Sequence, residues 1–182
     1  MKRIASVVSI LAGIAALAAG CSGETDNAAS PATTVTTVAV SLDPCEPFAT
    51  ALAAGGYDTP RRRPDRTTPY PELSCGFAHD NPGYSAGIYV MGKPYEDVVA
   101  DDRLVEREPR TVAGHDVSIG DASAVSDMCI ISIDIPPGTL QIRVGYVPPP
   151  ITQPDALTTI DQACAEAEKV LDIITPVLPD QL

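Results

Sequence analysis

Hydrophobic residues alternate with polar or small ones at 128–135, MCIISIDI, and at 140–147, LQIRVGYV. Side chains two residues apart share one face of a strand, so each segment predicts a strand with one buried side. The Pro-Pro-Gly sequence between them favours a turn, and we therefore predict an antiparallel pair. The residues expected on the shared faces are Cys129, Ile131, Ile133 and Ile135, and Leu140, Ile142, Val144 and Tyr146.

The same alternation occurs earlier in the chain. Apolar residues alternate with small ones at 73–77 and at 84–90, and the intervening Asp-Asn-Pro-Gly is typical of a hairpin turn. A smaller hairpin is expected around Gly114, between 111–113 and 117–119. The sheet is thus predicted to be mainly antiparallel.

Helix signals flank the predicted strands. In the segment DPCEPFATALAAGG, Asp43 can cap a helix, Pro44 fits its first position, and Gly55 or Gly56 can end it. Alanine, which recurs in this segment, has the highest helix propensity. We predict an N-terminal helix that contains Cys45.

A long closing helix is predicted from Asp155 to about Thr175, with Asp155 as its cap and Pro176 as its stop. Its apolar residues recur at steps of three or four, which makes one buried stripe. These residues are Leu157, Ile160, Cys164, Ala167, Leu171 and Ile174. A short helix is expected across 95–104, with inward-facing Val98, Val99 and Leu104.

This order of elements predicts one α+β domain over 43–182, with the N-terminal and C-terminal helices packed on the sheet. Residues 22–41 are small, polar and without helical periodicity, so 21–42 is expected to be a flexible tether. The alternation within 37–42 leaves an edge strand as a competing interpretation.

The segment 57–74 is too rich in proline to predict regular structure. It contains Arg61, Arg62, Arg63 and Arg66. This cluster is either a contact for an acidic partner or headgroup, or a solvated loop that balances an acidic body, and we favour the second interpretation.

The chain begins with the three parts of an export signal. Lys2 and Arg3 form a positive start, 4–19 an apolar core, and 18–20 a small-residue end. Such a segment is shorter than the roughly 20 apolar residues that span a bilayer comfortably, although an uncleaved anchor remains an alternative. We expect 1–20 to be a signal peptide.

The sequence Leu-Ala-Ala-Gly-Cys at 17–21 resembles the bacterial lipobox. The resemblance implies a thioether-linked diacylglycerol on Cys21, cleavage before it, and usually acylation of the new amino terminus. Two or more acyl chains hold a protein stably, whereas one is marginal. We therefore expect attachment to the cytoplasmic membrane through Cys21, on its extracytoplasmic face.

Lipidation of Cys21 leaves an even set of cysteines, Cys45, Cys75, Cys129 and Cys164. Four cysteines allow three pairings. Buried thiols would be expected in a cytosolic protein, whereas export favours disulfides. Because elements close in sequence are usually neighbours in space, we predict Cys45–Cys75 and Cys129–Cys164, each worth roughly 3–4 kcal/mol on the chain-entropy model.

Composition makes the exported body acidic. The chain has 12 basic and 24 acidic residues, and loss of Lys2 and Arg3 would leave 10 against 24, a net charge of −14. Such a body repels phosphate backbones and anionic headgroups, so no nucleic-acid partner is expected. With no tryptophan and 4% aromatic residues, the core must be aliphatic.

Together the lipobox, the tether and the cysteine positions resemble actinobacterial lipoproteins of domain-of-unknown-function family 3558. The motifs are Asp43-Pro44-Cys45 opening a helix, Ser74-Cys75-Gly76 in a strand, Cys129 in a late strand, and Cys164 in a closing helix before Leu178-Pro179. The resemblance covers roughly 15–180 and departs at Phe77, where tryptophan is common. It implies an envelope protein with a helix-covered antiparallel sheet and supplies no catalytic residues.

Two histidines, His79 and His115, each precede an aspartate. A histidine and an aspartate could act as a base and its orienting group, with Ser85 or Ser118 as nucleophile. Adjacent residues of a strand point to opposite faces, however, so exposed turn residues are the favoured interpretation. The acidic residues of 96–102 lack the alternate spacing of a calcium loop, and no metal, cofactor or catalytic residue is predicted.

The expected function is a non-catalytic module of the cell envelope, which binds a small molecule, a lipid or a protein through its sheet or loops. The alternatives are a cell-envelope hydrolase that uses His79 or His115, and a purely structural envelope protein.

Overall fold

The structure is a computed structural model that describes residues 36–150 and 153–182. The predicted signal peptide 1–20, Cys21 and the tether up to residue 35 lie outside the described residues. The unit that contains all described residues runs from Thr34 to Leu182.

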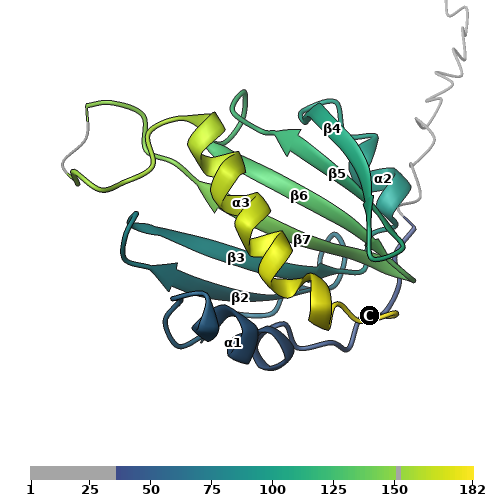
Figure 1. The fold of residues 1–182 in the computed structure, drawn as a ribbon. Coiled ribbons are helices and arrows are strands. Elements are labelled where there is room, and N and C mark those ends of the chain that lie inside the picture. Colours follow the sequence, from purple (N-terminus) through teal and green to yellow (C-terminus); the bar gives the residue numbers. More distant parts are fainter. Residues whose placement is uncertain (1–35, 151–152) are drawn as a thin grey trace, which may run out of the picture. The chain divides into compact units, whose positions relative to one another are not determined.

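Within this part of the chain, seven strands form one antiparallel sheet, and the predicted α+β class is confirmed. The strands are β1 (Arg61–Arg62), β2 (Glu72–His79), β3 (Tyr84–Met91), β4 (Val105–Val112), β5 (His115–Asp121), β6 (Met128–Ile135) and β7 (Gly138–Gly145). Their order across the sheet is β1-β2-β3-β7-β6-β5-β4 (Figure 1). Six of these strands form three hairpins, β2–β3, β4–β5 and β6–β7, and β1 pairs with the outer side of β2. The hairpins are joined where β3 pairs with β7 and where β5 pairs with β6.

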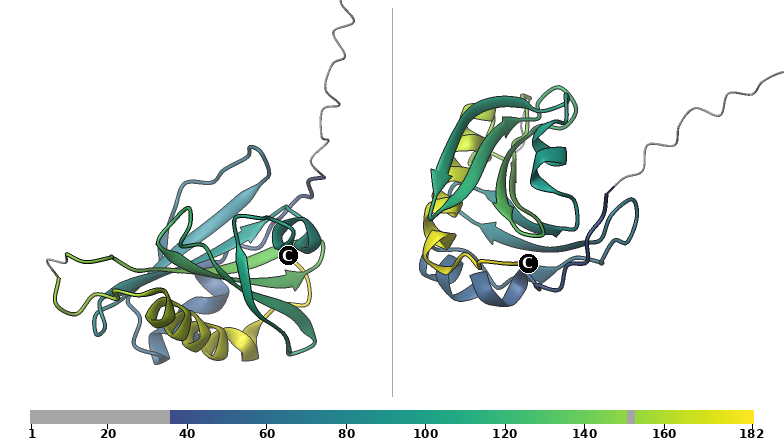
Figure 2. Two further views of the ribbon diagram at one scale, coloured as in Figure 1. Left: turned by 90° about the horizontal axis from the view of Figure 1, so that it is seen from above. Right: turned by 90° about the vertical axis from the view of Figure 1, so that its right-hand side faces the viewer.

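The described helices are α1 (Cys45–Ala54), α2 (Tyr95–Val99) and α3 (Ile160–Ile174), and a 3₁₀ turn η1 (Thr175–Val177) follows α3. Helices α1 and α3 cover one face of the sheet, and α2 lies against the other, inner side of its curve (Figure 2). The sheet is thus a middle layer with two different faces.

The face under α1 and α3 is the hydrophobic core. Strand register places Cys75, Ile88, Ile142, Ile131 and Ile119 in one row across five strands, and none is more than 2% exposed. Alternation at i and i+2 directs these side chains to the same face, as the sequence pattern predicts. The core is mainly aliphatic, as expected from the composition, and it includes both phenylalanines of the chain, Phe48 and Phe77.

Both predicted disulfides are confirmed. Cys45 of α1 bonds Cys75 of β2, and Cys129 of β6 bonds Cys164 of α3. The loops close over sequence separations of 30 and 35 residues. Each bond joins a helix to the sheet, and by the chain-entropy model each stabilises the fold by roughly 3–4 kcal/mol.

The start of the closing helix differs from the prediction. Helix α3 begins at Ile160, and the predicted cap Asp155 is wrong. Thr159 caps the helix instead: the backbone N–H of Gln162 donates to Thr159 Oγ1, and the Gln162 side chain accepts from the Thr159 backbone N–H, in a capping box. The preceding residues are held in another way, because the Asp155 carbonyl accepts from Gly83 N–H and the Leu157 carbonyl from Val147 N–H.

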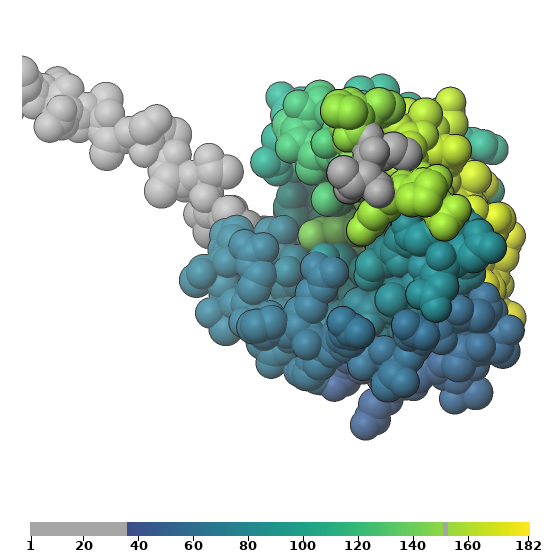
Figure 3. Space-filling model, turned by 90° about the vertical axis from the view of Figure 1, so that its left-hand side faces the viewer, coloured from purple at the N-terminus to yellow at the C-terminus, as the bar shows by residue number. Residues whose placement is uncertain are grey.

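These bonds lay the segment before α3 along the end of the β2–β3 hairpin. Figure 3 shows this side of the molecule, with the yellow-green segment around residue 155 beside the teal hairpin. Gly83 and Ala156 form an isolated bridge there. The backbone carbonyls of Asp155 and Leu157 accept hydrogen bonds from these neighbours, so this segment does not continue the helix.

Helix α2 is shorter than the expected 95–104 and ends at Val99, whose side chain is 38% exposed, so its predicted inward position is wrong. The helix ends there because Asp101 forms a turn with the residues that follow it. Its carboxylate accepts from the backbone N–H of Arg103 at 3.1 Å, and its carbonyl accepts from Leu104 N–H, which forms a turn. Val98 is buried as predicted, and Leu104 is partly buried.

The hairpin around Gly114 is longer than expected, with β4 and β5 in place of the short segments 111–113 and 117–119. Its turn fits the sequence, since Gly114 has φ +88°, a conformation that glycine adopts without strain. Strand β4 is an exposed edge, so its sequence VEREPRTV carries little alternation of apolar and polar residues.

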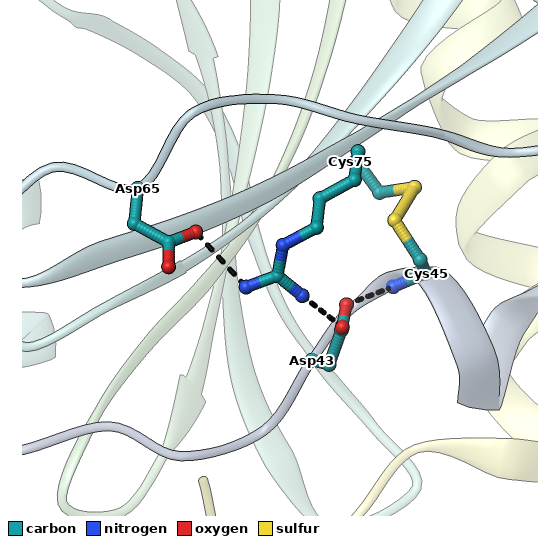
Figure 4. A network of polar contacts seen from close by, with 5 residues as sticks. Asp43, Cys45, Asp65 and Cys75 are labelled. Carbon is teal, nitrogen blue, oxygen red and sulfur yellow. Dashed lines mark hydrogen bonds and ion pairs between the residues drawn. A yellow bond between two sulfur atoms is a disulfide. The ribbon is translucent and has the colours of Figure 1, made fainter.

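The proline-rich segment 57–74 is not wholly irregular, because Arg61 and Arg62 pair with Gly76 and Cys75 as β1. Arg62 also donates to Asp43 and, at 2.9 Å, to Asp65 (Figure 4). Asp43 accepts from the Cys45 N–H at the start of α1, so this network lies beside the first disulfide.

Residues 36–42 form no strand, so the edge-strand interpretation of this segment is wrong. The segment nevertheless contacts the sheet. Val38 N–H donates to the Gly92 carbonyl at 2.9 Å, and Val40 and Leu42 pack partly buried against the core.

Candidate functional site

The inner face of the sheet, opposite α1 and α3, carries polar side chains at buried positions. Register places Ser74, Tyr89, Gln141, Ser132 and Ser118 in one row across β2, β3, β7, β6 and β5. None of these residues is more than 9% exposed. A buried polar row costs free energy unless its members are hydrogen-bonded, so its contacts are informative.

A pocket of about 610 Å³ opens on this face, beneath α2 and the loop 122–126. Its apolar wall comes from five separate elements or loops. The main apolar lining residues are Met91, Val98, Leu104, Val125, Met128 and Ile130. Both methionines of the described chain therefore line the pocket, and methionine adapts readily to ligands of different shape.

Arg143 of β7 forms the polar floor of the pocket. Its guanidinium carbon lies 3.9 Å from the centre of the Tyr89 ring, a cation–π contact. Its Nε donates to Gln141 Oε1 at 2.8 Å, and the Gln141 amide nitrogen donates to Ser132 Oγ at 2.8 Å. One Nη donates to Met91 Sδ at 3.3 Å. Arg143 is therefore held in one orientation by its neighbours.

Tyr89 lies flat across the sheet because Gly87 leaves room for its ring. A Cβ at Gly87 would be 2.6 Å from a ring carbon of Tyr89. The Tyr89 hydroxyl accepts from Arg63 Nη1 at 2.8 Å. The aromatic ring is thus fixed at both ends and supports Arg143 from below.

Glu72 is the carboxylate nearest to the floor, and it is 4% exposed. Its two oxygens lie 3.7 Å from Arg143 and 3.8 Å from Arg66, both beyond hydrogen-bond distance. Glu72 thus attracts both guanidinium groups without binding either closely.

The rim of the pocket contains an ion pair and a lysine. Asp101 accepts from Arg103 Nε at 2.8 Å and from its Nη2 at 2.6 Å. These bonds lower the pKa of Asp101 to about 2, so Asp101 is ionised and paired with Arg103 at any ordinary pH. Lys93 lies near enough to lower this pKa further, but among the described residues it has no carboxylate within 4.0 Å.

Comparison with known proteins assigns the chain by its sequence. The model of a family described as "Protein of unknown function (DUF3558)" matches residues 16–176. The chain belongs to the DUF3558 family. Neither the curated proteins nor the solved structures give a match. The resemblance seen in the sequence is confirmed at the level of the family.

The histidines of this DUF3558 chain lie away from the pocket. His79 Nδ1 bonds the Pro82 carbonyl at 3.0 Å, and the ring packs against Tyr57 and Tyr84. His115 Nδ1 bonds the Asp134 carbonyl at 2.8 Å. Because the partner in each case is a carbonyl, Nδ1 carries the proton and donates.

The candidate nucleophiles do not join these histidines. Ser85 is exposed on β3, and Ser118 Oγ donates to Glu106 Oε1 at 2.9 Å. Within the described residues, no hydrogen bond links a serine hydroxyl or a side-chain carboxylate to His79 or His115. The adjacent Asp116 accepts instead from Thr111, at 3.4 Å.

A second polar cluster, around Tyr84, is not predicted by the sequence pattern. The hydroxyls of Tyr57 and Tyr84 are 2.5 Å apart, and Tyr84 donates to Glu166 Oε2 at 3.1 Å. Lys169 donates to the other oxygen of Glu166 at 2.7 Å. Burial raises the pKa of both tyrosines, and Glu166 raises them further. The feature of the sequence that could have indicated this cluster is Glu166, a carboxylate among the buried residues of α3.

The described residues contain no group of three or more His, Cys, Asp or Glu side chains placed to hold a metal ion. The acidic residues of 96–102 illustrate this, since Asp101 is bound to Arg103. Of the predicted basic cluster, Arg63 and Arg66 contribute to the inner face, while Arg62 binds Asp43 and Asp65.

No helix in the described part of the chain has the length and hydrophobicity needed to cross a membrane.

Proposed function

We propose that this protein is an extracytoplasmic lipoprotein that binds a small molecule of the cell envelope in the pocket beneath α2 and catalyses no reaction. The leader and the lipobox support the location, because a charged start, an apolar core and a correctly placed Cys21 occur together. The two disulfides support it independently, since such bonds persist in oxidising compartments.

The pocket is the main observation that supports a binding function. Its volume of about 610 Å³ lies within the ~300–1,000 Å³ typical of small-molecule sites. Such sites combine apolar walls with a few fixed polar groups, and here Met91, Met128 and Ile130 surround a floor set by Arg143. A prearranged floor favours affinity because little conformational freedom is lost on binding.

The ionisable groups of the pocket favour binding over catalysis. A general base is most effective with a pKa near the working pH. The acid in the lining, Asp101, has a pKa of about 2 and is bound to Arg103. Neither His79 nor His115 lines the pocket.

Occupation of the pocket can be tested with N-phenyl-1-naphthylamine, an uncharged dye whose fluorescence rises in apolar surroundings. The full chain with Cys21→Ser, which lacks the lipid acceptor, is titrated with the dye. Ser126→Trp places a large side chain in the pocket lining, whereas Ser123→Trp adds the same ring to the same loop outside it. We expect saturable binding that Ser126→Trp weakens about tenfold or more and that Ser123→Trp leaves unchanged.

The parent and the two variants are otherwise the same chain, including Cys21→Ser. Dye that binds elsewhere on the chain therefore contributes equally to each titration. Circular dichroism checks that the variants keep the fold. A linear, unsaturable response in the parent, or equal responses in both tryptophan variants, would contradict a binding pocket at this position.

A further inference from the structure

The pocket lining is basic although the chain is acidic. The chain has 24 acidic and 12 basic residues, yet the lining has Arg66, Lys93, Arg103 and Arg143 against Asp101. Like charges gathered in a partly desolvated site repel one another, and an anion relieves that repulsion. This local reversal of sign indicates the charge of what the pocket binds.

We propose that the ligand is a single-chain amphiphile whose anionic head, a carboxylate or a phosphate monoester, contacts Lys93, Arg66 and Arg143. Its apolar chain lies along Val98, Leu104, Met128 and Ile130. This inference rests on the proposed function and adds the chemical class of the ligand.

The rim arginine is excluded as the main contact because its charge is already compensated. Arg103 makes two short hydrogen bonds to Asp101, at 2.8 and 2.6 Å. This bidentate geometry is the strong form of the arginine–carboxylate pair. A ligand anion would have to compete with Asp101 for Arg103.

The other three cations are not compensated in this way. Arg66 and Arg143 share Glu72, which lies 3.8 and 3.7 Å from them. Lys93 has no carboxylate within 4.0 Å among the described residues. Arg66 and Arg143 thus share one carboxylate that is 4% exposed, and Asp101, the carboxylate near Lys93, is bound to Arg103. An anionic head that enters from the solvent side of the pocket would balance the remaining positive charge.

Arg143 supplies a defined donor for that head. Its Nε is bound to Gln141, and its Nη2 faces Met91 Sδ and Glu72. Its Nη1 makes no hydrogen bond to any described residue, and it is not among the buried atoms that lack a partner. Nη1 therefore opens towards the pocket and can donate to an oxygen of the ligand.

The apolar wall requires more than a small anion. In the apolar lining, Met128 and Ile130 are only partly buried, and Val125 at the mouth is 60% exposed. An inorganic anion would leave this wall in water. An alkyl chain would cover it, and each buried methylene contributes about 0.8 kcal/mol.

The test is displacement of N-phenyl-1-naphthylamine by four ligands with the same chain, each kept below its micelle concentration. These are tetradecanoate, tetradecyl phosphate, tetradecanol and tetradecyltrimethylammonium. We expect both anions to displace the dye at about tenfold lower concentration than the alcohol, as one charge-assisted hydrogen bond allows. The cation should be the weakest competitor. The two anions distinguish a fatty acid from a lipid phosphate as the source of the head.

Substitution of the cations gives a second readout. Lys93→Met and Arg66→Met each remove one charge from the lining, while Arg61→Met removes one from exposed β1, outside it. We expect the first two variants to weaken tetradecanoate about fivefold to tenfold and to leave tetradecanol within twofold. Arg61→Met should leave both ligands unchanged.

Equal displacement by tetradecanoate and tetradecanol would overturn the anionic head, even though saturable dye binding would still support the pocket. The anionic head would also be overturned if Arg61→Met weakened tetradecanoate as much as Lys93→Met does, because the effect would then come from net charge. Loss of dye binding itself would instead count against the proposed function.

Discussion

At the scale of single residues, several polar side chains beneath α3 are each hydrogen-bonded to a specific neighbour. Tyr84 is an example, because its hydroxyl lies between Tyr57 and Glu166 and connects β3 to α3. Glu166 is 9% exposed and accepts a hydrogen bond from Lys169 Nζ at 2.7 Å. Removing one member leaves the other groups without a partner, and that loss costs more than the bond itself contributes.

The tyrosines make a prediction for alkaline pH. Burial and the neighbouring Tyr57 and Glu166 raise the pKa of Tyr84 above the ordinary value of 10.0. The unfolded chain therefore loses this proton first as pH rises, so stability is complete below about pH 10 and falls above it. We expect the free energy of unfolding in urea to decline from pH 9.5 to 11.5, with a smaller decline in Tyr84→Phe.

At pH 8 the same variant should lose about 1–3 kcal/mol, the cost of leaving a buried hydrogen-bonding group without its partner. Parallel curves for the parent and Tyr84→Phe across the alkaline range would show that Tyr84 ionises equally in both states. The raised pKa would then be wrong.

At the scale of elements, local pattern and tertiary contact compete for the ends of helices. Asp155 and Thr159 are both good N-cap residues by type. The backbone before Thr159 is bound to Gly83 and Val147, so the helix can begin only after it. The choice between the two caps was thus made by the β2–β3 hairpin and by the end of β7.

This choice predicts unequal effects of two alanine substitutions. Thr159→Ala removes the capping box of α3 and should lower the free energy of unfolding by about 1 kcal/mol. Asp155→Ala should change it by less than about 0.5 kcal/mol, because the Asp155 side chain is exposed and caps no helix. Urea unfolding monitored by circular dichroism gives both values.

The two variants are controls for each other, since they lie in one segment and make the same product residue. A larger loss for Asp155→Ala than for Thr159→Ala would place the start of the helix at the position that the sequence alone suggests.

At the scale of the whole molecule, the charge of the protein and its means of attachment have to be compatible. The chain has twice as many acidic as basic residues, so its net charge opposes general electrostatic attraction to an anionic lipid surface. Acyl chains on Cys21 would supply attachment without that attraction. The tether would let the domain stand away from the membrane.

The proposed lipid anchor on Cys21 makes a prediction for a single substitution. Cys21→Ser should release the protein from the membrane fraction, or leave it unprocessed, and in both cases abolish labelling by a fatty-acid probe. Ser22→Ala keeps the cysteine and serves as the control that remains attached and labelled. Membrane-bound Cys21→Ser protein of processed mass would contradict the anchor.

The sequence by itself determined the features that depend on near neighbours in the chain. Alternation placed β2, β3, β6 and β7 on their correct faces, and the stripe of α3 identified its buried side. The order of elements was also enough to pair Cys45 with Cys75 and Cys129 with Cys164, because each pair joins a helix to a strand in the same half of the chain.

Only the tertiary structure decided the pocket. Its lining comes from positions as far apart as Arg66 and Arg143, and their neighbourhood depends on strand register across the sheet. Alternation shows that Gln141 and Arg143 face away from the core, but it does not show that Tyr89 lies beneath them or that Glu72 lies beside them. The physical reason is that backbone periodicity acts over a few residues, whereas the placement of charge depends on contacts distant in the chain.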